Sequence, residues 1–179
     1  MGEGTSYRVL LVCSGNTCRS SMAEALMKET LKKLWPEGAQ RVAVASAGTA
    51  AWPGQPAADQ AVAAMAERGL DLSPHRARRL DQVMAGEYAL ILTMTRGQKA
   101  QVQQVARDGV RVYTLREYAR PETAPEQSDI ADPFGLSLDV YRRTAEELAA
   151  ELERAVLRLK NELEGPAALP PGDKEDKTP

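Results

Sequence analysis

A short apolar segment near the start of the chain, Arg8-Val-Leu-Leu-Val12, leads directly into a loop that contains a glycine. Apolar runs rich in β-branched residues are typical of strands that are buried on both faces of a parallel sheet. After the loop, apolar residues recur at steps of three and four from Ser20 to Leu34, which predicts a helix with one buried face. The chain therefore begins with a strand, a loop and a helix, which is the first unit of an α/β fold.

The limits of this first helix also have signals in the sequence. Ser21 and Glu24 have the spacing of a capping box, which places the start of the helix within a residue or two of Ser20. The segment Pro36-Glu37-Gly38 predicts its end, because proline and glycine both interrupt helices.

The alternation of strand and helix continues along the chain. The further strands are expected at residues 42–45, 89–93 and 110–113, and the further helices at residues 57–68, 96–106 and 138–163. Alternating strands and helices predict an open sheet of four parallel strands, with helices on both faces and right-handed crossovers. Ligands bind to such sheets beyond the carboxyl ends of the strands.

The chain of 179 residues is long enough for one domain of about 150 residues and a terminal extension. We expect the single domain at residues 7–164, after a flexible N-terminus at residues 1–6. Residues 165–179 are rich in proline and charge and poor in large apolar groups, which predicts a disordered tail.

Composition excludes several classes of protein. Two cysteines cannot form a disulfide framework, and with one histidine they fall short of the four ligands of a structural zinc site. The formal net charge of -2 gives no electrostatic case for binding nucleic acid or an anionic membrane. The apolar run from Val9 to Cys13 is far shorter than a signal sequence or a membrane span requires. We therefore expect a cytoplasmic, monomeric protein without nucleic-acid or membrane partners.

Both cysteines lie in the loop after the first strand, which reads Cys13-Ser14-Gly15-Asn16-Thr17-Cys18-Arg19-Ser20. The unpaired N–H groups and the positive end of the following helix converge there, which makes the loop an oxyanion site. Backbone N–H groups and the Arg19 fork can surround the three oxygens of a phosphate, with the Cys13 sulfur beneath its phosphorus. The same field favours a thiolate at neutral pH, so that His75, the single histidine, is not needed as a base.

Two other interpretations of this loop stay open. Cys13 is also the kind of small side chain that ends a buried strand, and Cys13 with Cys18 would suit a dithiol switch. The position of the loop between a buried strand and a helix favours phosphate chemistry, with oxidation of the two thiols to each other as a side reaction.

Several motifs resemble those of the low-molecular-weight protein phosphatases in their order and spacing. They are CSGNTCRSSMAEAL from Cys13, Ser46-Ala47-Gly48, SPHRARRL at residues 73–80 and Asp132-Pro133-Phe134-Gly135. The resemblance spans residues 7–163. It implies a single-domain, flavodoxin-like, doubly wound fold and a two-step reaction without metal or cofactor, in which a phosphocysteine forms and water then releases inorganic phosphate.

The resemblance also implies roles for individual residues. Cys13 would attack phosphorus, Arg19 would hold the phosphate, and Asp132 would protonate the leaving atom and later activate water. Ser20 would hydrogen-bond the thiolate and ease its departure. The residues expected to bind phosphate are Ser14, Gly15, Asn16, Thr17, Cys18 and Ser20.

Behind the loop, the resemblance predicts a supporting network. His75 would form hydrogen bonds there together with Asn16 and Ser46. The arginines at positions 76, 78 and 79 are interpreted as part of a solvated loop or helix start.

Three residues bear on the substrate. Thr17 lies directly before Cys18. In the family that this chain resembles, tyrosine-directed members usually have a bulky aliphatic residue at this position, whereas arginine-directed members have a threonine. Phe134, the single phenylalanine, follows Pro133 in a motif that resembles the one in arginine-directed members. Its ring would pack against a guanidinium. Trp52 would form another wall of the pocket, although an aromatic residue there is more typical of tyrosine-directed members.

The substrate prediction is therefore a protein phosphorylated on arginine. A protein-tyrosine phosphatase with the same mechanism is the alternative. An arsenate reductase on the same loop is a further alternative, but it would normally need cysteines beyond Cys13 and Cys18.

Overall fold

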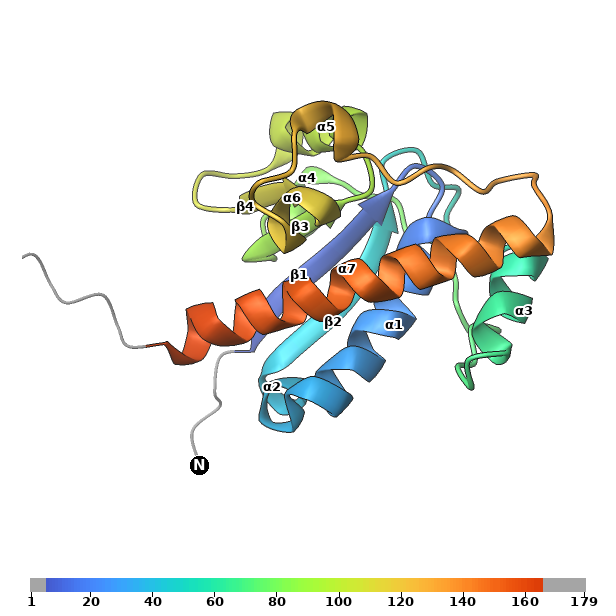
Figure 1. Cartoon of the computed structure of the whole chain (residues 1–179). Coiled ribbons are helices and arrows are strands. Elements are labelled where there is room, and N and C mark those ends of the chain that lie inside the picture. Colours follow the sequence, from blue (N-terminus) through green and yellow to red (C-terminus); the bar gives the residue numbers. More distant parts are fainter. Residues whose placement is uncertain (1–5, 166–179) are drawn as a thin grey trace, which may run out of the picture.

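Four parallel strands form the sheet of the computed structural model, which describes residues 6–165 apart from the side chain of Val83 (Figure 1). The strands are β1 (Tyr7–Cys13), β2 (Val42–Gly48), β3 (Leu90–Thr93) and β4 (Arg111–Thr114). Their order in the sheet is β2-β1-β3-β4. The prediction of a four-stranded parallel sheet is confirmed. Most of the two expected terminal extensions, at residues 1–5 and 166–179, lies outside the described residues.

The helices include three short ones that sequence periodicity did not predict. They are α1 (Arg19–Leu34), α2 (Pro36–Arg41), α3 (Asp59–Ala66), α4 (Gln82–Ala85), α5 (Arg96–Val105), α6 (Leu115–Ala119) and α7 (Leu138–Glu164), with a 3₁₀ turn at Pro125–Gln127. None of these helices combines the length and the apolar character needed to cross a membrane.

The segment predicted only to end α1 forms α2 as well. Pro36 occupies the first helical position, where its missing N–H group costs nothing. Gly38 faces Trp35, and a Cβ atom at that position would lie 2.0 Å from the Trp35 ring. The glycine therefore serves close packing against a fully buried tryptophan rather than a break in the chain.

The capping box predicted at Ser21 and Glu24 is wrong, although the predicted start of the helix is right. Cys18 is the N-cap residue of α1, and no side chain caps this end. Ser21 instead donates a hydrogen bond to the Cys18 carbonyl at 2.9 Å, and Glu24 accepts one from Ser46. The first amides of α1 are consequently not satisfied by a capping side chain.

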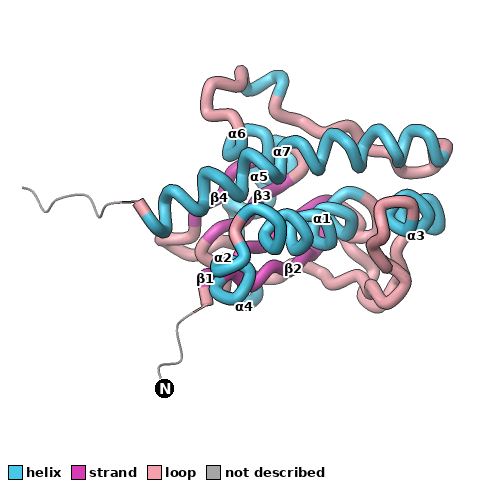
Figure 2. Tube along the Cα trace, turned by 60° about the horizontal axis from the view of Figure 1, so that its bottom comes forward, coloured by secondary structure: helices cyan, strands magenta, loops and turns pink. Residues whose placement is uncertain are grey.

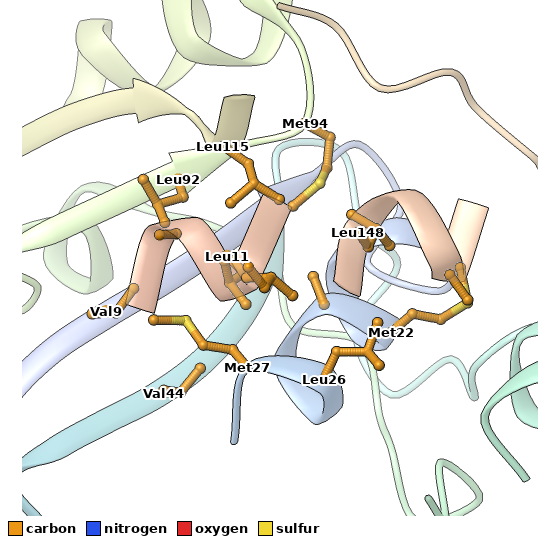
Figure 3. Packing of buried hydrophobic residues seen from close by; sticks show 14 of the residues in the cluster. Val9, Leu11, Met22, Leu26, Met27, Val44, Leu92, Met94, Leu115 and Leu148 are labelled. Carbon is orange, nitrogen blue, oxygen red and sulfur yellow. The ribbon is translucent and has the colours of Figure 1, made fainter. Parts of the chain in front are cut away.

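Helices cover both faces of the sheet, as the alternating strand residues require. Val9 and Leu11 of β1 face the larger cluster, which α1 and α7 complete, whereas Leu10 and Val12 face the smaller one with Val102 of α5. Figure 2 shows α1 and α7 side by side over the sheet, and Figure 3 shows the apolar side chains of β1, β2 and β3 meeting those of the two helices.

The sheet order places the loop after β1 at a special position. β1 pairs with β2 on one side and with β3 on the other, so the chain leaves β1 in one direction and later returns to its opposite side. Open α/β sheets bind ligands at such a switch point, beyond the carboxyl ends of the strands. The fold therefore presents the Cys13 loop at the expected ligand site.

A cluster of charged and aromatic side chains joins α7 to the edge of the sheet. Glu162 accepts hydrogen bonds from Arg111 at 2.8 and 3.0 Å, from Arg158 at 2.8 Å and from the Tyr118 hydroxyl at 2.8 Å. Burial alone raises the pKa of Glu162, but these hydrogen bonds outweigh it and lower the pKa from 4.5 to about 2. The ionised carboxylate thus stabilises the folded state.

The Glu162→Gln variant is expected to be less stable than the wild type at neutral pH by about 1–3 kcal/mol, because three donors lose a charged acceptor. The folded-state pKa lies below the unfolded one, so this contribution is complete above about pH 4.5 and is lost as the pH falls through about 2. Denaturant unfolding of both proteins across this range should show the difference narrowing on acidification. A difference that stays constant would contradict the assignment.

Candidate active site

Cys13, the last residue of β1, lies at the base of the loop and is buried. Its Sγ atom accepts a hydrogen bond from the Asn16 backbone N–H at 3.2 Å and lies 2.9 Å from Ser20 Oγ. Ser20 therefore lies where the resemblance predicted, against the proposed nucleophile.

Asn16 holds the loop in its shape. It has a backbone φ of 57°, in the left-handed region that asparagine tolerates better than most residues. Its side-chain Nδ2 donates to Ser20 Oγ at 2.8 Å and to Ser46 Oγ at 3.0 Å, while its backbone oxygen lies 2.6 Å from His75 Nε2. The structure thus brings Asn16, Ser46 and His75 together, as the sequence analysis predicted.

Two further residues, which the sequence analysis did not predict for this role, support the network. Glu24 accepts a hydrogen bond of 2.5 Å from the Ser46 hydroxyl. Arg78, interpreted from the sequence as a solvated side chain, donates through its guanidinium to the Ser46 carbonyl at 3.1 and 3.3 Å, and its backbone N–H donates to Asn16 Oδ1. The arginine segment is an exposed loop, as interpreted, but parallel pairing at Gly48 and Arg79 holds it against β2, so that Arg78 reaches the Ser46 carbonyl from the surface.

Gln98 fixes the other side of the loop. Its Nε2 donates to Ser14 Oγ at 3.1 Å, and its Oε1 accepts from the backbone N–H groups of Met94 and Thr95. Thr95 and Gln98 form a true capping box at the start of α5. The spacing Thr-x-x-Gln was the sequence signal that could have revealed this residue.

Gly48 lets β2 approach the loop closely. It pairs with Cys13 across the sheet, and a Cβ atom at this position would lie 2.4 Å from the Ser14 carbonyl and 2.9 Å from the Asn16 nitrogen. Any side chain would push the loop away from the strand. The glycine of the Ser46-Ala47-Gly48 motif is therefore a condition for the loop geometry.

Arg19 is buried at the start of α1 and faces the segment that contains Ile130 and Asp132. Its Nη1 donates to the Ile130 carbonyl at 2.8 Å, and its Nη2 lies 3.2 Å from Asp132 Oδ2. Among the described residues, Arg19 Nε is a buried nitrogen without a hydrogen-bond partner. Buried donors are normally satisfied, so this one suits an anionic ligand in the loop.

Asp132 stands opposite the loop and is half exposed. Its Oδ1 accepts a hydrogen bond from the Phe134 backbone N–H at 3.2 Å, which holds the carboxylate in a local turn. The Arg19 contact directs the other oxygen toward the loop. The three residues predicted to be catalytic, Cys13, Arg19 and Asp132, therefore line one cavity.

This cavity has a volume of about 300 Å³. Its lining residues are Cys13, Ser14, Gly15, Thr17, Cys18, Arg19, Gln55, Asp132 and Phe134. Asn16 and Ser20, which were also predicted to bind phosphate, are fully buried within the loop and are not among the residues that line the cavity. Phe134 lies at the cavity with 69% of its surface exposed.

Trp52 does not line the cavity, and 79% of its surface is exposed. The turn that it begins ends at Gln55, whose N–H donates to the Trp52 carbonyl at 3.2 Å, and Gly54 within the turn has a φ of 85°. This tight turn brings Gln55 to the cavity in place of the tryptophan. Trp52 was predicted to form a wall of the cavity, but in this structure Gln55 lines the cavity at this side.

The second cysteine is chemically distinct from the first. Cys18 Sγ lies 3.1 Å from the hydroxyl of Tyr141 on α7. Burial raises the pKa of the Cys18 thiol, which outweighs the hydrogen bonds from Tyr141 and Thr17 that lower it. Cys18 is thus a neutral thiol at neutral pH, which leaves Cys13 as the candidate nucleophile of the loop.

A metal centre has no support among the residues at 6–165, where no three or more His, Cys, Asp or Glu side chains gather in a way that could hold an ion. The cavity lies at the N-terminus of α1 and is lined by Arg19, and both features are typical of a site that binds an oxyanion.

Known proteins resemble this chain over almost its whole length. The protein-arginine-phosphatase of Bacillus subtilis is 37% identical over 155 residues, which cover 86% of this chain and 97% of the relative. A probable low molecular weight protein-tyrosine-phosphatase, EpsP of Ralstonia nicotianae, is 36% identical over 154 residues, or 85% and 95% of the two chains.

The solved structures give the same picture. A YwlE arginine phosphatase whose active-site cysteine is replaced by a phosphorylated serine superposes with a TM-score of 0.76 at 36% identity, covering 86% of this chain and 95% of that one. The fold is the flavodoxin-like fold expected from the sequence. The family described as low molecular weight phosphotyrosine protein phosphatase matches residues 8–165. On these grounds the chain belongs to the low molecular weight phosphotyrosine protein phosphatase family.

Proposed function

We propose that the protein hydrolyses phosphoarginine on other proteins through a phosphocysteine at Cys13. The observation that carries this proposal is the cavity in which the Cys13 thiol, the Arg19 guanidinium and the Asp132 carboxylate meet. A sulfur nucleophile, an anion clamp and a proton donor in one cavity are the three groups that transfer of a phosphoryl group requires.

In the first step, the loop amides and Arg19 hold the phosphoryl oxygens, and the Cys13 thiolate attacks phosphorus. The bond between phosphorus and sulfur forms while the bond between phosphorus and the leaving nitrogen breaks. Asp132 gives its proton to that nitrogen, so the arginine side chain leaves protonated. The half-exposed position of Asp132 at the cavity edge supports this role, since the carboxyl group can reach a substrate that enters from solvent.

In the second step, the Asp132 carboxylate takes a proton from a water molecule, whose oxygen attacks phosphorus. The bond between phosphorus and sulfur breaks, inorganic phosphate forms, and Cys13 leaves as a thiolate. Ser20 Oγ, 2.9 Å from Cys13 Sγ, is placed to hydrogen-bond this departing sulfur. Arg19 holds the equatorial oxygens through both steps.

Three features support phosphoarginine as the substrate. Thr17 lines the cavity with a short side chain that carries a hydroxyl, where a bulky aliphatic side chain would narrow the cavity and offer only apolar contact. The exposed Phe134 ring can stack on a planar guanidinium, and the Asp132 carboxyl group, protonated before the first step, can hydrogen-bond the nitrogen that it will protonate. The B. subtilis relative that shares 37% of its residues is a protein-arginine-phosphatase.

Phosphotyrosine is the second candidate, because EpsP is 36% identical and is described as a probable protein-tyrosine-phosphatase. An identity difference of this size does not separate the two substrates. The choice therefore depends on the residues that line the cavity, and first on Thr17.

The Thr17→Ile variant is expected to shift the preference between the two substrates by roughly tenfold or more toward phosphotyrosine, because an apolar branch replaces the hydroxyl and favours a phenyl ring. The measurement is the ratio of kcat/KM for matched peptides that carry phosphoarginine or phosphotyrosine. Thr17→Val, which keeps the shape and removes the hydroxyl, separates polarity from size. A wild type that strongly prefers phosphotyrosine, with no change in Thr17→Ile, would refute the arginine assignment.

We also propose that the protein works as a monomer in the cytoplasm and releases inorganic phosphate. The free thiols of Cys13 and Cys18 support a reducing compartment, since both sulfurs lie in the loop that the reaction uses.

A further inference from the structure

The segment that carries Asp132, which we call the acid loop (residues 127–134), is tied to the rest of the molecule by several contacts, and two of them come from one arginine. Arg116 of α6 donates through Nη1 to the Gln127 carbonyl at 2.7 Å and to the Asp129 carbonyl at 3.2 Å. Its side chain is only 20% exposed. One side chain therefore satisfies two backbone carbonyls at the start of the acid loop.

The other edge of the same guanidinium contacts two carboxylates of α7. Arg116 Nη2 pairs with Glu147, and Arg116 Nε lies 3.4 Å from Glu151 Oε1. The Glu151 side chain is 4% exposed, and its second oxygen is held by Arg120 at 2.9 Å. A carboxylate buried to this degree is fixed by its partners, so it orients the Arg116 fork toward the loop.

The remaining anchors of the acid loop lie next to those of Arg116. The Ile130 N–H donates to the Met94 carbonyl at 2.8 Å, and the Ile130 carbonyl accepts from Arg19 at 2.8 Å. Asp129 Oδ1 accepts from the Arg96 N–H at 2.8 Å. The chain is thus held at residues 127–130, and Asp132 follows two residues later.

Asp132 itself has few direct restraints. Its side chain is 54% exposed and contacts Arg19 and the Phe134 N–H. The Arg19 contact cannot by itself hold the carboxylate during the reaction, because Arg19 also serves the phosphate. The place of the Asp132 carboxyl group must therefore be set largely by the backbone that Arg116 anchors.

We propose that Arg116 is a positioning residue for Asp132: with Glu147 and Glu151 it fixes the acid loop so that the carboxyl group reaches the leaving atom. This inference rests on the acid role of Asp132 in the proposed function. Proton transfer depends steeply on position, and a displacement of about 1 Å can cost a factor of roughly 10². Arg116 would therefore affect protonation of the leaving group and would not affect binding of the phosphate.

Two substrates that differ in their leaving group separate these effects. 4-Nitrophenyl phosphate releases a stable phenolate that needs little protonation, whereas phenyl phosphate releases a poor leaving group, similar to a tyrosine side chain. Arg116→Gln is expected to lower kcat/KM for phenyl phosphate by roughly 10- to 100-fold, and for 4-nitrophenyl phosphate by less than about threefold. The constant kcat/KM is suitable because it covers the step in which the leaving group departs.

Arg158→Gln is the matched control. Arg158 likewise joins α7 to α6, through Glu162 and the Tyr118 carbonyl, but it contacts neither the acid loop nor Glu147 and Glu151, so both substrates should keep their rates within about twofold. Arg116→Lys keeps a positive charge beside Glu151 and loses the fork, and an intermediate, equally selective loss is expected. This variant keeps the test open if Arg116→Gln proves unstable.

Asp132→Asn provides the reference, and it separates failure of this inference from failure of the proposed function. If Asp132→Asn lowers both substrates equally, the acid role of Asp132 is refuted. If Asp132→Asn is selective for phenyl phosphate but Arg116→Gln and Arg116→Lys lower both rates equally, or neither, the positioning role of Arg116 is refuted.

Discussion

The Cys13→Ser variant is expected to lose turnover by roughly 10⁴-fold or more while it stays folded and still binds inorganic phosphate. A serine hydroxyl is a far weaker acid than a thiol, no histidine lines the cavity to take its proton, and Asp132 must stay protonated to serve the leaving group. The amides of the loop and Arg19 are untouched by the substitution, so the anion site remains.

The slow chemistry that remains should leave a trace on the protein. An alkoxide is a much poorer leaving group than a thiolate, so a phosphoryl group that reaches the introduced serine is not released. The YwlE arginine phosphatase with a phosphorylated serine at its active site shows that a relative can carry such a group. Intact mass spectrometry after incubation with substrate should detect one added phosphoryl group on the variant.

Cys18→Ser is the control for this experiment. It replaces the other sulfur of the same loop, whose contacts are with Tyr141 and Thr17 rather than with the reacting atoms, and it should retain far more activity. A Cys13→Ser variant with activity near that of the wild type would exclude the phosphocysteine mechanism.

The loop that these experiments address could be predicted from the sequence because its signals are local. A buried strand, a glycine, two cysteines, an arginine and the start of a helix follow one another within residues 9–20. Strand and helix periodicity then fixes on which edge of the sheet the loop lies. Cys13 and Arg19 follow from that placement alone, whereas the roles of Ser20 and Asp132 needed the motif resemblance, and Asp132 is also far away in the sequence.

The support around the loop could not be predicted in the same way. Arg78, Gln98 and Arg116 reach their partners over long sequence separations, and nothing in their neighbours shows which carbonyl or hydroxyl they will meet. From the sequence alone, none of these three residues can be distinguished from a polar residue that has no structural partner. Trp52 shows the opposite failure, since an aromatic residue in a loop near the site turns out to lie in solvent.

Local motifs also misled when two of them competed. Ser21 and Glu24 match a capping box, but the loop N-terminal to them already fixes the helix start at Arg19, and Glu24 is used by Ser46. The same pattern at Thr95 and Gln98 does form a capping box. The difference lies in tertiary partners, which short sequence spacing does not contain.

The Arg19→Lys variant is expected to lower kcat/KM by roughly 10³-fold, although the charge is conserved. The Arg19 fork serves the Ile130 carbonyl through one nitrogen and Asp132 through another, and its Nε atom is left for the ligand. A single ammonium group cannot meet these three directions at once. Measurements of kcat/KM and of the melting temperature separate lost catalysis from lost folding.

The leaving group distinguishes this loss from the one expected at Arg116. Arg19 stabilises charge on the phosphoryl oxygens, which are the same in every substrate, so Arg19→Lys should slow 4-nitrophenyl phosphate and phenyl phosphate to a similar degree. Arg76→Lys is the control, because Arg76 is exposed and donates to the nearby carbonyls of Ser73 and His75, and it should stay within about twofold of the wild type. Retention of a tenth or more of wild-type kcat/KM in Arg19→Lys would show that charge alone suffices, and that the fork geometry of Arg19 is not what holds the transferring phosphate.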